Sequence, residues 1–148
     1  MRASRGLAVI RAVWREPAVG FLALRMASWV CVLSAVAPLC SMPRAFRLIT
    51  PIGRGFFACE TRLAPARLAA VLDAILRSDV AAFTPICWKR AAILYRYLRL
   101  SGREARILFG MQRREHPELA AHAWVEVDGH PVFEAARPDF VVVYRFPS

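Results

Sequence analysis

The fold of this chain is decided by two stretches, TPICWKRAAILYRYLRLSG at residues 84–102 and AHAWVEVDGHPVFE at residues 121–134. The first predicts a helix, with Thr84 as N-cap, Pro85 in the first turn and Gly102 as the C-terminal stop. The second alternates in period two, which indicates a strand, and its Asp128-Gly129 pair is typical of a hairpin turn. A helix followed by a hairpin is therefore expected.

The rest of the chain extends this order of helices first and strands afterwards. Helices are expected within residues 1–16, over 18–41, in the first part of 44–58 and over 65–77. Strands are expected at 105–110, 122–127, 131–135 and 140–146. The sequence therefore predicts an α+β fold, in which N-terminal helices precede a cysteine-bearing helix packed on a small antiparallel sheet. Residues 1–45 form an apolar, arginine-dotted region and residues 46–148 the core, within one compact domain.

Composition narrows the class of protein. The chain has 148 residues, of which 57% are hydrophobic, and this excludes intrinsic disorder. Its net charge is +10, carried almost wholly by arginine, with Lys89 as the single lysine. The arginines are scattered, and no nucleic-acid motif accompanies them, so we expect no nucleic-acid partner. We find no Gly-rich phosphate loop and expect no cofactor.

The apolar segment 21–42 has three interpretations. From Met26 to Met42 it lacks any charge, which is the short end of a membrane span, although Pro38 weakens a straight one. A buried or partner-facing helix is favoured, peripheral membrane association comes second, and a cleaved signal ending near Ala35-Val36-Ala37 comes last. The expected location is the cytoplasm, with the inner membrane face as the alternative.

Cys87 and His122 are the candidate catalytic pair. A cysteine in the first turn of a helix lies near unpaired backbone N–H groups, which favour a thiolate and can stabilise an oxyanion on an attacked carbonyl. Lys89 and Arg90 add positive charge nearby unless they are simply solvated. His122 begins a strand and can act as the base of a nucleophilic cysteine.

Glu134 is the candidate third member, under a structural condition. A two-residue hairpin loop would place Glu134 on the face opposite His122, whereas a three-residue loop through His130 would place both on one face. The triad therefore predicts an odd loop or a bulge in this hairpin. Asp139 is the substitute for Glu134.

Every one of these residues also has a purely structural interpretation. A lone cysteine is usually a small core residue, which is the interpretation kept for Cys31, Cys40 and Cys59. No Cys-x-x-Cys pair occurs and no ligand pair has metal-site spacing, so no metal site and no disulfide framework is expected. Glu126 sits on the same strand as His122, and Asp128 is explained by the turn.

Three segments together resemble one family: Cys87 to Gly102, Ala105 to Gly110, and Ala121-His-Ala-Trp-Val-Glu-Val-Asp-Gly129 with Pro131-Val-Phe-Glu134. They resemble the leader peptidase of lasso-peptide biosynthesis, the B protein, a member of the transglutaminase-like cysteine protease superfamily. The resemblance covers about residues 84–135. It implies a transglutaminase- or papain-like fold and a Cys87–His122–acid triad; the third position in that family is often aspartate, so Glu134 departs mildly from it.

The resemblance also implies partners. The substrate would be a ribosomal precursor peptide, cut at its leader–core junction, and a separate ATP-dependent lasso cyclase would use the freed amine. Residues 1–80 show no sheet of a leader-recognition module, so a stand-alone peptidase with a separate leader-recognition protein is expected. Two alternatives stay open: a transglutaminase-like acyltransferase or amidase on another substrate, and a non-catalytic membrane- or partner-binding protein.

Overall fold

The computed structural model describes residues 16–53, 64–77, 87–112, 121–133 and 140–147. Within them the helices come first, followed by the strands, so the predicted α+β order is confirmed. The helices are α2 (Pro17–Val36), α3 (Met42–Ile49), α5 (Pro65–Leu76) and α6 (Cys87–Leu100). The strands are β1 (Ala105–Gln112), β2 (Ala121–Val127), β3 (His130–Val132) and β4 (Phe140–Phe146). The helix expected within residues 1–16 lies outside the described residues.

Proline and glycine set several of the helix ends. Each of α2, α3 and α5 has a proline at its first or second position, where the missing N–H would have no partner within the helix. Gly102 follows α6 with φ 82°, the left-handed conformation that closes a helix, and Arg103 N donates to Leu98 O at 3.1 Å. The predicted stop at Gly102 is therefore confirmed.

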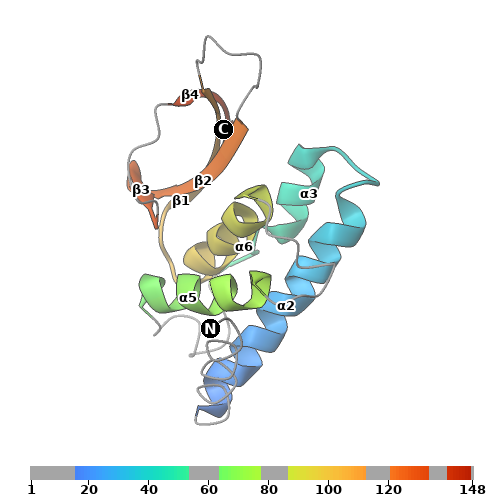
Figure 1. Cartoon of the computed structure of the whole chain (residues 1–148), viewed down its shortest axis with the longest axis vertical. Coiled ribbons are helices and arrows are strands. Elements are labelled where there is room, and N and C mark those ends of the chain that lie inside the picture. The colour runs from blue at the N-terminus through green and yellow to red at the C-terminus, as the bar shows by residue number, and fades with distance from the viewer. Residues whose placement is uncertain (1–15, 54–63, 78–86, 113–120, 134–139, 148) are drawn as a thin grey trace.

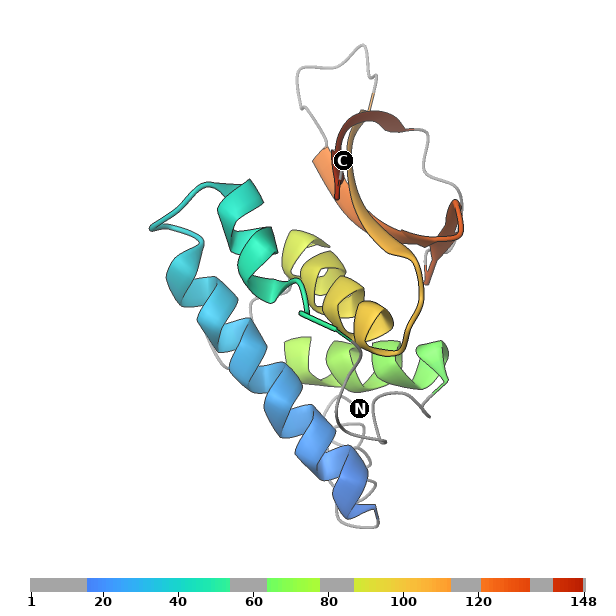
Figure 2. The same ribbon diagram turned by 180° about the vertical axis from the view of Figure 1, so that it is seen from behind.

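Helix α6 lies at the centre of the molecule. It packs against α2, α3 and α5 on one side and against β2 and β1 on the other. Figures 1 and 2 show it between the helical layer and the sheet. Most of its residues are buried as a result; they are Lys89, Ala91, Ala92, Ile93, Leu94, Tyr95, Tyr97, Leu98 and Leu100.

The sheet has four antiparallel strands in the order β3-β2-β1-β4, and it is strongly curved (Figure 1). Ile107, Ala123 and Val125 face the helices and belong to the main core. Leu108 and Trp124, paired with each other in the register, alternate onto the opposite face. A register shift between Phe109 and Gly110 interrupts the pairing of β1 with β4.

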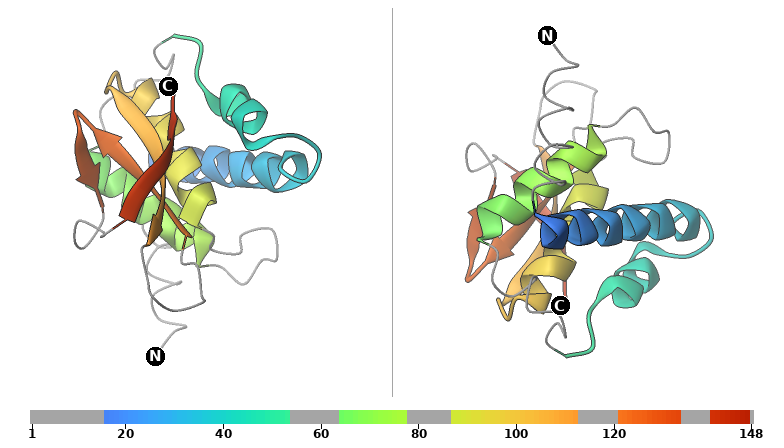
Figure 3. Two further views of the ribbon diagram at one scale, coloured as in Figure 1. Left: turned by 90° about the horizontal axis from the view of Figure 1, so that it is seen from above. Right: turned by 90° about the horizontal axis from the view of Figure 1, so that it is seen from below.

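Two further contacts hold α2 and α3 against α6. Arg96 of α6 stacks its guanidinium 3.9 Å from the ring centroid of Trp29 in α2, and its Nη1 donates to Ile49 O at the end of α3 at 2.7 Å. The ring of Phe46 in α3 lies 5.4 Å from that of Phe146 in β4. Figure 3 shows α2 crossing the other helices, with its C-terminal end and α3 extending to one side.

The burial of one face of α2 predicts unequal effects for two neighbouring leucines. Leu22 is 1% exposed and Leu24 is 65% exposed. Leu22→Ala should lower the free energy of unfolding by about 2–5 kcal/mol, because it opens a cavity in the core. Leu24→Ala should change it by less than about 0.5 kcal/mol. Chemical denaturation measures both, and equal effects would contradict the packing of α2 into the core.

Candidate active site

Cys87 is the first described residue of α6, so it lies on the helix that the sequence predicted for it. Its side chain is partly buried and packs against the main core. A helix N-terminus presents backbone N–H groups that have no partner inside the helix. The predicted cap and first-turn residues, Thr84 and Pro85, lie outside the described residues. The position of Cys87 at this end of α6 is compatible with the predicted role as a nucleophile.

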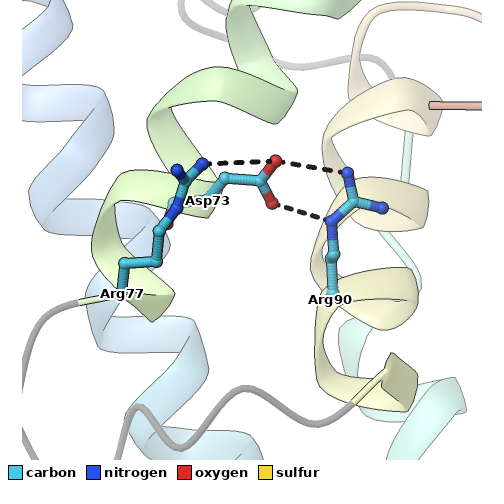
Figure 4. Close-up of polar contacts among 3 residues, drawn as sticks. All are labelled: Asp73, Arg77 and Arg90. Atoms are coloured by element: carbon cyan, nitrogen blue, oxygen red, sulfur yellow. Dashed lines mark hydrogen bonds and ion pairs between the residues drawn. The ribbon is translucent and has the colours of Figure 1, made fainter. Parts of the chain in front are cut away.

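The charges beside Cys87 are engaged rather than solvated. Arg90 forms a two-point ion pair with Asp73 of α5, with Nε to Oδ1 at 2.7 Å and Nη2 to Oδ2 at 3.3 Å (Figure 4). Arg77 approaches the same carboxylate at 3.9 Å. Lys89 is 7% exposed, and its Nζ lies 6.0 Å from the centroid of the Trp88 ring. The alternative of two solvated cations is therefore wrong, and Asp73 positions the first turn of α6 against α5.

His122 lies on β2, which packs against α6, so the elements that carry the thiol and the imidazole are neighbours. The imidazole itself projects from the sheet face opposite Ala123 and Val125. There it stacks against Trp124, with ring centroids 6.1 Å apart, and against Phe140, at 5.5 Å. In this structure the imidazole therefore forms an aromatic stack with Trp124 and Phe140.

Gly110 lies directly beneath the side chains of Trp124 and Phe140 in this aromatic stack. It pairs with His122 across β1 and β2. A Cβ at this position would lie 2.6 Å from Cβ of Phe140 and 2.8 Å from two carbons of the Trp124 ring. Only glycine therefore lets the aromatic side chains close over the strand.

The hairpin beyond β2 closes with a two-residue loop. Val127 pairs with His130, and Asp128 and Gly129 both have positive φ, 52° and 79°, as a tight hairpin turn requires. The three-residue loop through His130 that would have aligned Glu134 with His122 is therefore wrong. Sequence spacing did not settle it, because both loop lengths suit an Asp-Gly turn.

The chain nevertheless departs from strand geometry just before Glu134. Phe133 has φ 63°, so the regular alternation of faces in β3 stops at this residue. Glu134 and Asp139 lie outside the described residues, and so does Cys59. The choice between Glu134 and Asp139 as the group that orients His122 stays a prediction.

The remaining described candidates serve structural roles. Glu126 accepts a hydrogen bond from Nε1 of Trp124 at 3.4 Å, and four strand residues separate it from His122 by about 13 Å, beyond direct contact. His130 Nδ1 lies 3.0 Å from Asp128 O at the turn. Cys31 is exposed and Cys40 is partly buried, and neither begins a helix. These residues leave Cys87 and His122 as the reactive pair to test.

A cavity of about 500 Å³ lies elsewhere, between α3, α6 and β4. Tyr95, Arg99 and Tyr144 help to line it. Tyr95 is eight residues along α6 from Cys87, which corresponds to about 12 Å. This cavity is therefore separate from the reactive thiol.

Comparison with known proteins identifies the superfamily. The chain matches the family model described as "Transglutaminase-like superfamily" over residues 44–145, more than half of its length. The chain therefore belongs to the transglutaminase-like superfamily, which generally includes cysteine-dependent enzymes. No curated protein and no solved structure gives a significant match to the chain. The matched region contains both Cys87 and His122, and its class points to protease- or acyltransferase-type chemistry.

Breaking the partly buried ion pair between Asp73 and Arg90 should destabilise the protein more than breaking an exposed ion pair. Asp73→Asn should lower the free energy of unfolding by about 1–3 kcal/mol, because the guanidinium of Arg90, with 25% of its side chain exposed, loses its charged partner. Glu104→Gln breaks the pair with Arg99, where the Glu104 side chain is 81% exposed. That control should cost less than about 1 kcal/mol. Denaturant titration measures the free energy of unfolding of both variants. Equal losses would contradict the prediction that the Asp73–Arg90 pair contributes more to stability.

Proposed function

We propose that this chain is a cysteine endopeptidase that removes the leader from a ribosomally made lasso-peptide precursor. The observation that carries the proposal is the position of Cys87 at the N-terminus of α6, against the strand that carries His122, within the transglutaminase-like region. A thiol at a helix N-terminus, with an imidazole on the adjoining sheet, is the arrangement of a nucleophilic cysteine and its base. The substrate assignment follows from the resemblance of the His-Ala-Trp-Val-Glu strand and the cysteine helix to lasso leader peptidases.

In this mechanism Cys87 Sγ attacks the carbonyl carbon at the leader–core junction, after His122 accepts the thiol proton. Backbone N–H groups at the start of α6 would stabilise the resulting oxyanion. The imidazolium then gives its proton to the departing core amine, and the leader stays on Cys87 as a thioester. Water, deprotonated by His122, hydrolyses the thioester and restores the thiol. Glu134, or Asp139 in its place, would orient the imidazole.

The proposal needs the imidazole and the thiol within reach of one proton. His122 stacks against Trp124 and Phe140, and in the mechanism its imidazole takes the proton of Cys87. Catalytic contacts are often loose without substrate and tighten when it binds, so a peptide bound beside Cys87 would draw the two groups together. The freed core amine would then pass to a separate cyclase, and a separate recognition protein would deliver the leader.

Removal of the nucleophile or the base should abolish precursor cleavage. Cys87→Ala and His122→Ala are each expected to lower the rate by at least about a thousandfold, because members of such a unit depend on one another. Cys31→Ala and Cys40→Ala are matched thiol controls and should cleave at the wild-type rate. Mass spectrometry of the products, with the recognition protein present, measures cleavage. Full activity in Cys87→Ala would exclude the mechanism.

The same assay separates hydrolysis from acyl transfer. A peptidase releases the leader with a free carboxylate, whereas an acyltransferase joins it to an added amine, and the two products differ in mass. We expect only the free carboxylate. A leader–amine adduct as the main product would favour the acyltransferase alternative.

The orienting acid can be identified by comparing two variants. Glu134→Ala should slow cleavage by about a hundredfold or more, because the imidazole loses the group that fixes its tautomer and direction. Asp139→Ala should retain most of the activity. The ratio of kcat/KM for the two variants is the measurement, and a larger loss in Asp139→Ala would reassign the role to Asp139.

A further inference from the structure

The outer face of α2 is apolar along most of its length. Phe21, Leu24 and Val32 expose 51%, 65% and 38% of their surfaces. Exposed residues recur every three or four positions and form one stripe, which we call the α2 stripe: Phe21, Leu24, Ser28, Cys31, Val32 and Ala35. The hydroxyl of Ser28 donates to Leu24 O at 2.9 Å, so its polarity is partly satisfied within the helix. A contiguous exposed apolar stripe of this length is typical of a surface that binds a protein or a membrane.

Exposed apolar and positively charged residues also occur beyond α2, in the following turn and on α3. Leu39, in the turn after α2, is 83% exposed, and Leu48 of α3 is 49% exposed. Arg44 and Arg47 are exposed on the same short helix α3. Arg25, on α2, lies with its guanidinium carbon 5.9 Å from the ring centroid of Phe21. Guanidinium groups thus accompany the apolar residues at both ends of this surface.

The segment of sequence that carries these arginines contains no acidic residue. Between Pro17 and Cys59 the sequence contains neither aspartate nor glutamate. The carboxylate of Glu16, just before α2, is bound by Arg67 at 2.6 Å. The chain as a whole carries a net charge of +10. An apolar surface accompanied by arginine, without carboxylates, is complementary to a surface that is both apolar and anionic.

We propose that α2 and α3 form a docking surface for an anionic phospholipid membrane, with α2 lying in the plane of the interface. In this arrangement the α2 stripe enters the headgroup–acyl boundary, and the exposed Arg44 and Arg47 contact lipid phosphates. The proposal does not depend on the peptidase chemistry, because it uses neither Cys87 nor His122.

The structure distinguishes lying on a membrane from crossing it. By length and composition α2 could span a bilayer, with a mean hydropathy of 1.9. Its inner face, however, is part of the main core: Val19, Leu22, Met26, Val30 and Leu33 are at most 5% exposed. A spanning α2 would have to withdraw these side chains from α5 and α6. An interfacial α2 keeps the core intact and covers only the surface that is now exposed.

Vesicle sedimentation with the full chain tests the proposal. The wild-type protein should sediment with vesicles of phosphatidylcholine and phosphatidylglycerol, bind far less to pure phosphatidylcholine, and dissociate as salt is raised. Replacing Phe21 and Leu24 together by Gln should weaken binding at least about tenfold, because two apolar side chains no longer enter the lipid. Replacing Arg44 and Arg47 together by Gln should weaken it roughly 30-fold.

Two matched variants control for general effects of charge and hydrophobicity. Val141 and Val143 of β4 are 57% and 58% exposed, on the far side of α6 from α2 (Figures 1 and 2), and replacing both by Gln should leave binding unchanged. Replacing the exposed Arg103 and Arg106 by Gln removes the same charge as the α3 variant and should have a much smaller effect. Circular dichroism checks that each variant is folded.

Three outcomes would overturn the proposal. They are failure of the wild-type chain to bind anionic vesicles, equal weakening by the control variants, and a dimer in solution that the Phe21 and Leu24 change dissociates while lipid binding stays the same. The last result would assign the α2 stripe to a second copy of the chain. Cleavage by the soluble protein is a separate measurement, so failure of this proposal is distinguishable from failure of the proposed peptidase.

Discussion

The burial of α6 between a helical layer and a curved sheet is the constraint on which the rest of the structure depends. Nearly every turn of this helix is covered, so α2, α3 and α5 have to supply apolar surface on one side and β1 and β2 on the other. This end of the helix is thereby fixed in place, with Cys87 as its first described residue. The same burial forces the charges beside it into partnerships, since Arg90 is held by Asp73 and Lys89 is almost fully covered.

The surroundings of His122 follow from the geometry of the sheet. The alternation of β2 directs Ala123 and Val125 toward α6, so His122 and Trp124 project from the other face. Gly110 then allows Trp124 and Phe140 to close over the strand and hold the imidazole. The stacked imidazole is the group that the proposed mechanism uses as its base. A substrate that brings it together with Cys87 would couple peptide binding to assembly of the nucleophile.

Helix α2 combines two roles that are usually separated. Its inner face completes the core around α6, while its outer face stays apolar, and residues 17–59 of the sequence contain no acidic residue. A helix of this composition reads as a membrane anchor when it is considered alone. Packing divides it lengthwise instead, because residues three and four apart share one face and only that face meets α5 and α6. Only the outer face of α2 is available to a membrane. The proposed interaction is therefore peripheral.

The sequence by itself determined the order of elements, the helix that carries Cys87, its stop at Gly102 and the Asp128-Gly129 turn, because these depend on local periodicity and backbone preference. It also indicated the superfamily, through three segments between residues 84 and 135. Only the tertiary structure decided which face of β2 meets α6, the two-residue closure of the hairpin, and the engagement of Arg90 by Asp73. These features depend on contacts between segments far apart in the chain, and local pattern cannot specify them since a shift of one residue in register exchanges the two faces of a strand.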